Sequence, residues 1–150
     1  MTQSINQFSQ TAERGQVALL NGANPAISVM IDASVTATLK SGDAVKIVAT
    51  SKGLPKVIPT TAVDDVADGF IMFNPVKNEF TGNDRCEMLF TGGFMYMIAG
   101  AATPAKSKVQ YNPDNGYVGV AAADANMVGI AVDTASAVGD LIRVKIKSAF

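Results

Sequence analysis

The sequence predicts an all-β fold, a small β-barrel or sandwich of short strands preceded by an extended N-terminal arm. One pattern supports this three times: a Gly-containing turn with an acid leads into an alternating run at Ser41-Gly42-Asp43, Gly82-Asn83-Asp84 and Gly139-Asp140. Period-two alternation places apolar side chains on one face, as in a half-buried strand. Short apolar runs between turn residues fill the rest, and none has the length and about 3.6-residue period of an amphipathic helix.

Residues 1–24 differ from the rest of the chain and predict the arm. Residues 1–16 are rich in Gln, Ser, Thr and Asn, with isolated apolar residues at Ile5 and Phe8. This segment has too little apolar content to fold alone. Two interpretations stay open: a frayed terminus, or an arm that becomes ordered on a partner as an added strand contacting it through Ile5 and Phe8.

Residues 25–150 are predicted to form a single β-barrel-like domain. In its first half, apolar and β-branched runs predict strands at 26–31, 35–39 and 45–50. Pro55 and Pro59 bracket a segment at 56–58 that is typical of an edge strand, because proline cannot donate to a sheet. Residues 60–68 predict a loop or a single helical turn, and the short apolar run at 69–73 predicts a strand buried on both faces.

The second half contains six predicted strands. Residues 86–90 and 94–98 flank Thr91-Gly92-Gly93 and predict a hairpin. A second hairpin is predicted from a strong turn signal between two further runs, and a linker precedes the last two strands. These elements are the runs 108–111 and 117–120 around the turn 112–116, the linker 121–126, and the strands 127–132 and 141–146.

Composition argues against several classes of function. The 150 residues carry a net charge of −1, so a nucleic-acid partner held by bulk electrostatics is not expected. The chain has no His, which removes the commonest general base and the commonest metal ligand. Cys86, the single cysteine, lies on the apolar side of an alternating run and is predicted to be a small buried hydrophobe. We expect no membrane partner, because no apolar run approaches the roughly 20 residues that span a bilayer.

The acidic residues are predicted to have structural roles. Asp64, Asp65 and Asp68 resemble part of a Ca²⁺ loop but lack its regular spacing and terminal Glu, so a solvated loop is favoured. The acids of the three repeated turns each follow a turn position, which favours turn capping over paired carboxylate chemistry. A small hydrolase using Asp64 and Asp68 is the weakest alternative, and it requires two acids facing one pocket, at least one with a raised pKa. The sequence therefore predicts no catalytic residue, no metal and no cofactor.

Two groups of residues leave alternatives open. Tyr96, Tyr111 and Tyr117 could form the aromatic surface of an OB-like or carbohydrate-recognising binding module. Their basic neighbours are few, so core packing is favoured. The methionines between residues 86 and 98 predict either core filling or an apolar self-association surface.

The order of several segments resembles the capsid decoration, or structural cement, proteins of tailed bacteriophages. The likeness covers roughly residues 35–147 and is carried by segments 39–46, 68–71, 92–96, 128–131 and 139–144. It implies a compact β-domain on the capsid surface of the virion, made in the host cytoplasm and commonly trimeric. Such proteins bridge neighbouring subunits of the major capsid protein and stabilise the head against internal DNA pressure. The resemblance brings no catalytic motif.

The arm is expected to hold the capsid, an inference from its composition. Deleting residues 1–16 is then expected to abolish capsid binding and to leave the fold intact. The candidate contact residues of the arm are Ile5, Phe8, Val17, Leu19 and Leu20.

Overall fold

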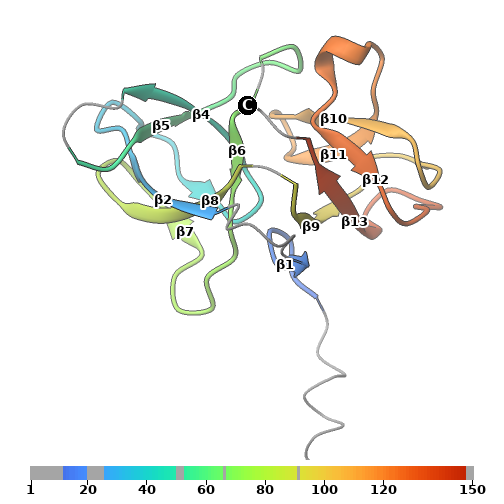
Figure 1. The fold of residues 1–150 in the computed structure, drawn as a ribbon, viewed down its shortest axis with the longest axis horizontal. Helices are drawn as coiled ribbons and strands as arrows, with labels where there is room; N and C mark the ends of the chain where they lie inside the picture. Colours follow the sequence, from blue (N-terminus) through green and yellow to red (C-terminus); the bar gives the residue numbers. More distant parts are fainter. Residues whose placement is uncertain (1–11, 20–25, 50–52, 66, 91, 148–150) are drawn as a thin grey trace, which may run out of the picture.

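The computed structural model describes residues 12–19, 26–49, 53–65, 67–90 and 92–147, and within these ranges the predicted all-β fold is confirmed. Figure 1 shows two lobes side by side, each built on its own sheet. The one helical element in the described ranges is a single 3₁₀ turn, η1 (Asp124–Asn126), which lies in the predicted linker.

The first lobe is a closed five-stranded barrel with the strand order β2-β5-β4-β6-β8. Closure leaves each of these strands paired on both sides, which removes free sheet edges. Beside the barrel, β3 and β7 pair with each other as a two-stranded sheet. The strands of this lobe are β2 (Ala26–Ile31), β3 (Leu39–Lys40), β4 (Ala44–Ala49), β5 (Lys56–Pro59), β6 (Gly69–Ile71), β7 (Glu79–Phe80) and β8 (Arg85–Leu89).

The second lobe is a six-stranded sheet with the order β1-β9-β13-β12-β10-β11, antiparallel throughout. The sheet is curled. Contacts between the segment after β9 and β11 show this: the Gly100 N–H donates to the Val118 carbonyl at 2.8 Å, and Ala99 forms a parallel bridge with Val118. The end of β9 therefore meets β11 across the curled sheet. Its strands are β1 (Val17–Leu19), β9 (Phe94–Ile98), β10 (Lys108–Asn112), β11 (Tyr117–Val120), β12 (Gly129–Ala131) and β13 (Leu141–Ile146).

The two lobes share part of their core. One buried cluster, which includes Val29 and Met88, lies within the barrel. The other contains Phe70 and Leu89 from the barrel together with second-lobe residues such as Met95. The rings of Phe70 and Tyr111 meet edge to face across the two lobes, with centroids 5.8 Å apart. The methionines at 88, 95 and 97 are all buried, so the core-filling interpretation is confirmed.

The predicted hairpin of residues 86–90 and 94–98 is wrong. Both strands exist, but β8 pairs with β2 and β6 in the barrel, whereas β9 pairs with β1 and β13 in the other lobe. Both edges of β8 are occupied, so β9 has no edge of β8 to join. The chain instead crosses from one lobe to the other between these strands. The hairpin of β10 and β11 is confirmed, as are the strands at 26–31 and 141–146.

Two further strand predictions need correction. Residues 35–38 are not a strand; the Asp32 carboxylate accepts the Ser34 N–H and the Asp32 carbonyl accepts the Val35 N–H, so a local turn replaces sheet bonds. The segment at 56–58 is not an edge, because β5 pairs with β2 on one side and with β4 on the other. Its two prolines stand at or just before the ends of β5, where a missing donor is tolerated.

The three repeated turns share one arrangement, which confirms turn capping by their acids. In each turn the carboxylate accepts the N–H of the residue three positions earlier, and the residue just before the acid has a positive φ. The N–H donors are Lys40 to Asp43 at 2.7 Å, Thr81 to Asp84 at 2.8 Å and Ala137 to Asp140 at 3.1 Å; the φ values are 88° at Gly42, 70° at Asn83 and 95° at Gly139. Each acid therefore fixes the point at which the following strand begins.

Turn capping predicts a loss of stability in acid. The Thr81 N–H lowers the pKa of Asp84 below 3.8, and the Ser136 N–H does the same to the pKa of Asp140. A carboxylate whose pKa is lower in the folded chain contributes stability above its unfolded value, and this contribution disappears as pH falls through the folded pKa. We expect the urea concentration at the midpoint of unfolding to decrease as the pH is lowered below about 4. This fall should be smaller in the double variant Asp84→Asn, Asp140→Asn; an equal fall in the variant and the wild type would contradict the prediction.

Close strand packing at Gly129 predicts a large effect of one methyl group. A Cβ there would lie 2.4 Å from the Lys145 carbonyl oxygen, whereas a Cβ on Gly119 of the same sheet would have nothing within 4 Å. We expect Gly129→Ala to lower the free energy of unfolding by about 1–3 kcal/mol. Gly119→Ala should be close to neutral. Urea denaturation of both variants measures the difference, and equal effects would disprove this packing.

Candidate functional site

The described carboxylates Asp65 and Asp68 of the acidic loop are held by an ion pair and by backbone hydrogen bonds. Lys46 donates to both carboxylate oxygens of Asp65, at 2.8 and 2.9 Å, and this contact lowers the pKa of Asp65. Asp68 accepts the Ile47 N–H at 2.7 Å, and Asp64 is exposed. No group of three potential metal ligands comes together among the described residues. Salt-bridging and strand capping therefore account for Asp65 and Asp68.

Cys86 and Tyr111 lie in the interior of the protein and not on its surface. Cys86 is buried in the barrel core, and burial raises the pKa of its thiol to about 12. The ring of Tyr111 lies in the interior with 5% exposure, where burial raises its pKa to about 12. Tyr96 and Tyr117 are half-buried on other strands. A shared stacking platform that includes Tyr111 is thus excluded.

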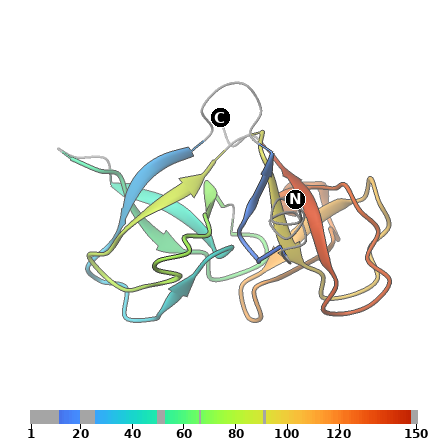
Figure 2. The same ribbon diagram turned by 90° about the horizontal axis from the view of Figure 1, so that it is seen from below.

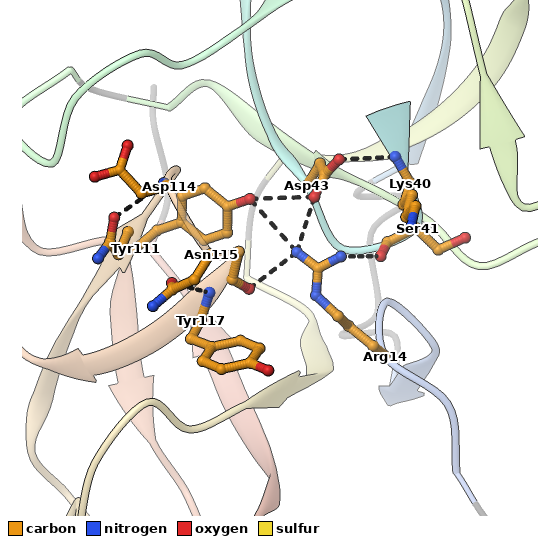
Figure 3. Close-up of polar contacts among 10 residues, drawn as sticks. Arg14, Lys40, Ser41, Asp43, Tyr111, Asp114, Asn115 and Tyr117 are labelled. Carbon is orange, nitrogen blue, oxygen red and sulfur yellow. Dashed lines mark hydrogen bonds and ion pairs between the residues drawn. The ribbon is translucent and has the colours of Figure 1, made fainter. Parts of the chain in front are cut away.

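The most connected polar site lies at the junction of the two lobes and centres on Arg14 (Figure 3). Its Nη1 donates to the Ser41 carbonyl at 2.7 Å, and its Nη2 donates to Asp43 Oδ1 at 2.9 Å and to the Gly116 carbonyl at 3.0 Å. The Tyr111 hydroxyl donates to the same Asp43 oxygen at 3.2 Å and lies 3.4 Å from Nη2. One guanidinium therefore joins a barrel turn to the β10–β11 hairpin.

The backbone next to Arg14 also forms hydrogen bonds to both lobes. The Gly15 N–H donates to the Tyr96 carbonyl at 2.8 Å, and the Gly15 carbonyl accepts the Phe73 N–H at 2.9 Å. Gly15 has a φ of 80°, and a Cβ on it would lie 2.5 Å from the Gly42 nitrogen, so only glycine fits here. We call residues 12–19 the strap. In Figure 2 the blue strap lies between the two lobes, beside β9.

The strap contains two of the residues predicted to be capsid contacts of the arm, Val17 and Leu19. Val17 belongs to β1, opposite Met95, and packs half-buried against the shared core. Leu19 lies in β1 opposite Phe94. The other candidate contacts, Ile5, Phe8 and Leu20, lie outside the described residues.

Sequence reasoning missed Arg14 and Gly15, the two residues that anchor the strap. The signal available was thin: Arg14 is one of three arginines, and a glycine that can adopt positive φ follows it. A deletion of residues 1–16 would remove both residues and their contacts with the two lobes, so we expect it to destabilise the fold. The segment that can be removed without breaking these contacts ends at residue 11.

A hollow opens next to the strap, lined by Glu13, Arg14, Lys40, Ser41, Phe73 and Glu79. The exposed loop that follows Phe73 contains Val76, whose side chain is 92% exposed. The Asn74 side chain accepts the Val76 N–H at 2.9 Å, which stiffens the loop tip. The strap and this loop thus border the same end of the molecule.

Comparison with known proteins identifies a shared fold. No family model matches the chain, and a search of curated proteins finds no significant match. Among solved structures, the chain is similar to the N base of the head fiber protein gp8.5 of bacteriophage phi29, with a TM-score of 0.57 and 11% sequence identity. The similarity covers 81% of this chain and 92% of that chain. This protein therefore has the fold of the base of a phage head fiber.

The described part of the chain contains no helix with the length and apolar character that crossing a bilayer requires.

The Arg14 junction predicts an unequal cost for two arginine substitutions. The side chains of Arg14 and Asp43 are only 18% and 21% exposed, so Arg14→Ala removes the cationic partner of the Asp43 carboxylate and the donor to two carbonyls. We expect a loss of about 2–3 kcal/mol in the free energy of unfolding. The matched control is Arg143→Ala, because Arg143 pairs with Asp133 but its side chain is 45% exposed. That variant should lose less than about 1 kcal/mol; equal losses in urea denaturation would refute the structural role of Arg14.

Proposed function

We propose that this protein is a structural component of a bacteriophage virion that binds the outer surface of the head and stabilises it by bridging capsid subunits. The observation that carries the proposal is the fold it shares with the base of the phi29 head fiber over 92% of that chain. The order of the Gly-Asp turns and strands, which resembles the decoration proteins, supports the same assignment.

The chemistry of the described residues favours a role in binding. The aspartates with shifted pKa values, among them Asp65 and Asp133, all have lowered pKa values and serve as turn caps or ion-pair partners. A general acid would need a raised pKa. A decoration protein instead depends on modest contacts repeated around a symmetric shell, where multivalency gives strong retention.

We propose that residues 1–11 act as the capsid-binding arm, with Ile5 and Phe8 as its apolar contacts. The strap fixes the root of this arm, because Arg14 and Gly15 hold residues 12–19 against both lobes. An arm that orders on binding costs roughly 2–5 kcal/mol in lost entropy. A fixed root lowers that cost relative to an arm that is free along its whole length. Val76 lies in the loop next to the strap and is well placed to contact the same surface.

We also propose that the protein binds as a homotrimer at symmetry positions of the head. Near-neutral net charge weakens repulsion between copies, and closed symmetry gives every copy the same interface. Sedimentation equilibrium of the purified chain measures this directly, and a mass of one chain at all concentrations would disprove a preformed trimer.

Sedimentation with phage heads that lack this protein tests the proposed function. We expect the full chain to pellet with the heads and the chain of residues 12–150 to remain in the supernatant, because it lacks Ile5 and Phe8. The shortened chain should unfold at the same urea concentration as the full chain, since the strap is intact. If the full chain does not pellet, the head-binding role is wrong. If both chains pellet equally, the arm has no part in binding.

A further inference from the structure

The outward side chains of β9, β12 and β13 form one surface, which we call the outer sheet face. The strand register places Ile130 beside Lys145, and Lys145 beside Phe94, in a row across the three strands. In the next row Arg143 lies beside Tyr96. The face comprises Phe94, Tyr96, Ile130, Val132, Arg143 and Lys145.

The exposed apolar side chains of this face lie on β12 and directly after it, and the partly exposed Phe94 lies on β9. The inward residues Met95 and Val144 are fully buried, whereas Ile130 and Val132 on the outer side are 38% and 36% exposed. Scattered exposed apolar residues are ordinary on a protein surface. Ile130 and Phe94 flank Lys145 in one row, and with the tyrosine and arginine of the next row they have the composition of a protein interface.

The charge of the face is positive. The strands β9, β12 and β13 contain no acidic residue. Arg143 is paired with Asp133 at the rim, with a shortest distance of 2.6 Å. Lys145 is exposed and has no carboxylate partner in the part of the chain that the structure describes. This lysine, with apolar neighbours on both sides, can accept a carboxylate from outside.

A shallow hollow ends the face and suits an apolar side chain. It is lined by Gly92, Met127, Gly129 and Ile130, together with Lys145 and Lys147. Two lysines thus stand at a hollow whose other lining residues have no charged side chain. An apolar side chain flanked by carboxylates fits this combination.

We propose that the outer sheet face is a docking surface for a capsid protein segment that presents an apolar side chain beside carboxylates. This inference rests on the proposed function and adds a second contact, separate from the arm. Charge complementarity selects the partner, because like charges brought together disfavour binding. A two-fold contact between copies would place Lys145 near its own counterpart. DNA fits less well, because Arg143 and the neighbouring Lys108 are already paired with Asp133 and Asp124.

Sedimentation with heads that lack the protein tests this face with matched variants of the full chain. The face variant is Ile130→Thr, Lys145→Glu. The control variant, Val48→Thr, Arg85→Glu, likewise replaces one β-branched apolar residue by Thr and one cation by Glu, at exposed positions of the barrel strands β4 and β8. We expect the face variant to bind at least tenfold more weakly and the control to bind like the wild type. Lys145→Glu alone should weaken binding, and Lys145→Arg should preserve it.

Each outcome decides between the two proposals. Wild type and control that pellet while the face variant does not, with equal urea midpoints, support the docking face. If all variants pellet alike, the face is not a docking surface and the head-binding role still stands. If the double variant Ile130→Thr, Lys145→Glu loses binding while the single variant Lys145→Glu keeps it, the proposed role of charge is refuted. A change in oligomeric mass, or competition by duplex DNA, would assign the face to another partner and overturn the proposal. A wild type that does not pellet removes both proposals.

Discussion

The guanidinium of Arg14 is the interaction on which the arrangement of the molecule depends. A charge that is largely withdrawn from water is costly unless it is paired and hydrogen-bonded, and the Arg14 side chain is only 18% exposed. Arg14 finds an Asp43 carboxylate oxygen and two backbone carbonyls, from a barrel turn and from the β10–β11 hairpin. The flat, fixed fork of an arginine can reach these acceptors together, whereas a lysine presents a single point charge. The N-terminal strap, the barrel and the curled sheet meet at this one group.

The junction explains how two small sheets form one body. The shared cluster around Phe70 and Leu89 buries apolar surface from both lobes. Gly15 adds backbone bonds to Tyr96 in the second lobe and to Phe73 after the barrel strand β6. A molecule held in this way presents fixed surfaces, which suits a protein that acts by contact. The strap also sets where the proposed arm leaves the body, beside the exposed loop that carries Val76.

Alternation along the chain was enough to predict most strands but could not predict their partners. Residues 142–146 alternate strictly, and β13 covers the whole predicted range 141–146. The two runs at 86–90 and 94–98 around a glycine-containing turn predicted a hairpin. Such a local pattern carries no information about which strand lies alongside. Some short-range polar hydrogen bonds were also not predicted. At Asp32 they form a turn in place of the strand predicted from Val35 onward. The three acid-capped turns were predictable because their donors and acceptors lie within four residues of each other. Arg14 was not, because its partners lie 27 to 102 residues away in sequence.

Native-state hydrogen exchange tests most directly whether the strap is part of the folded body. The amide N–H groups of Gly15, Phe73 and Tyr96 form the backbone bonds of the strap. If the strap opens only when the whole molecule unfolds, these amides will exchange with the same free energy as those of the core strands β8 and β13. Fast exchange of the three amides while β8 and β13 stay protected would contradict the account.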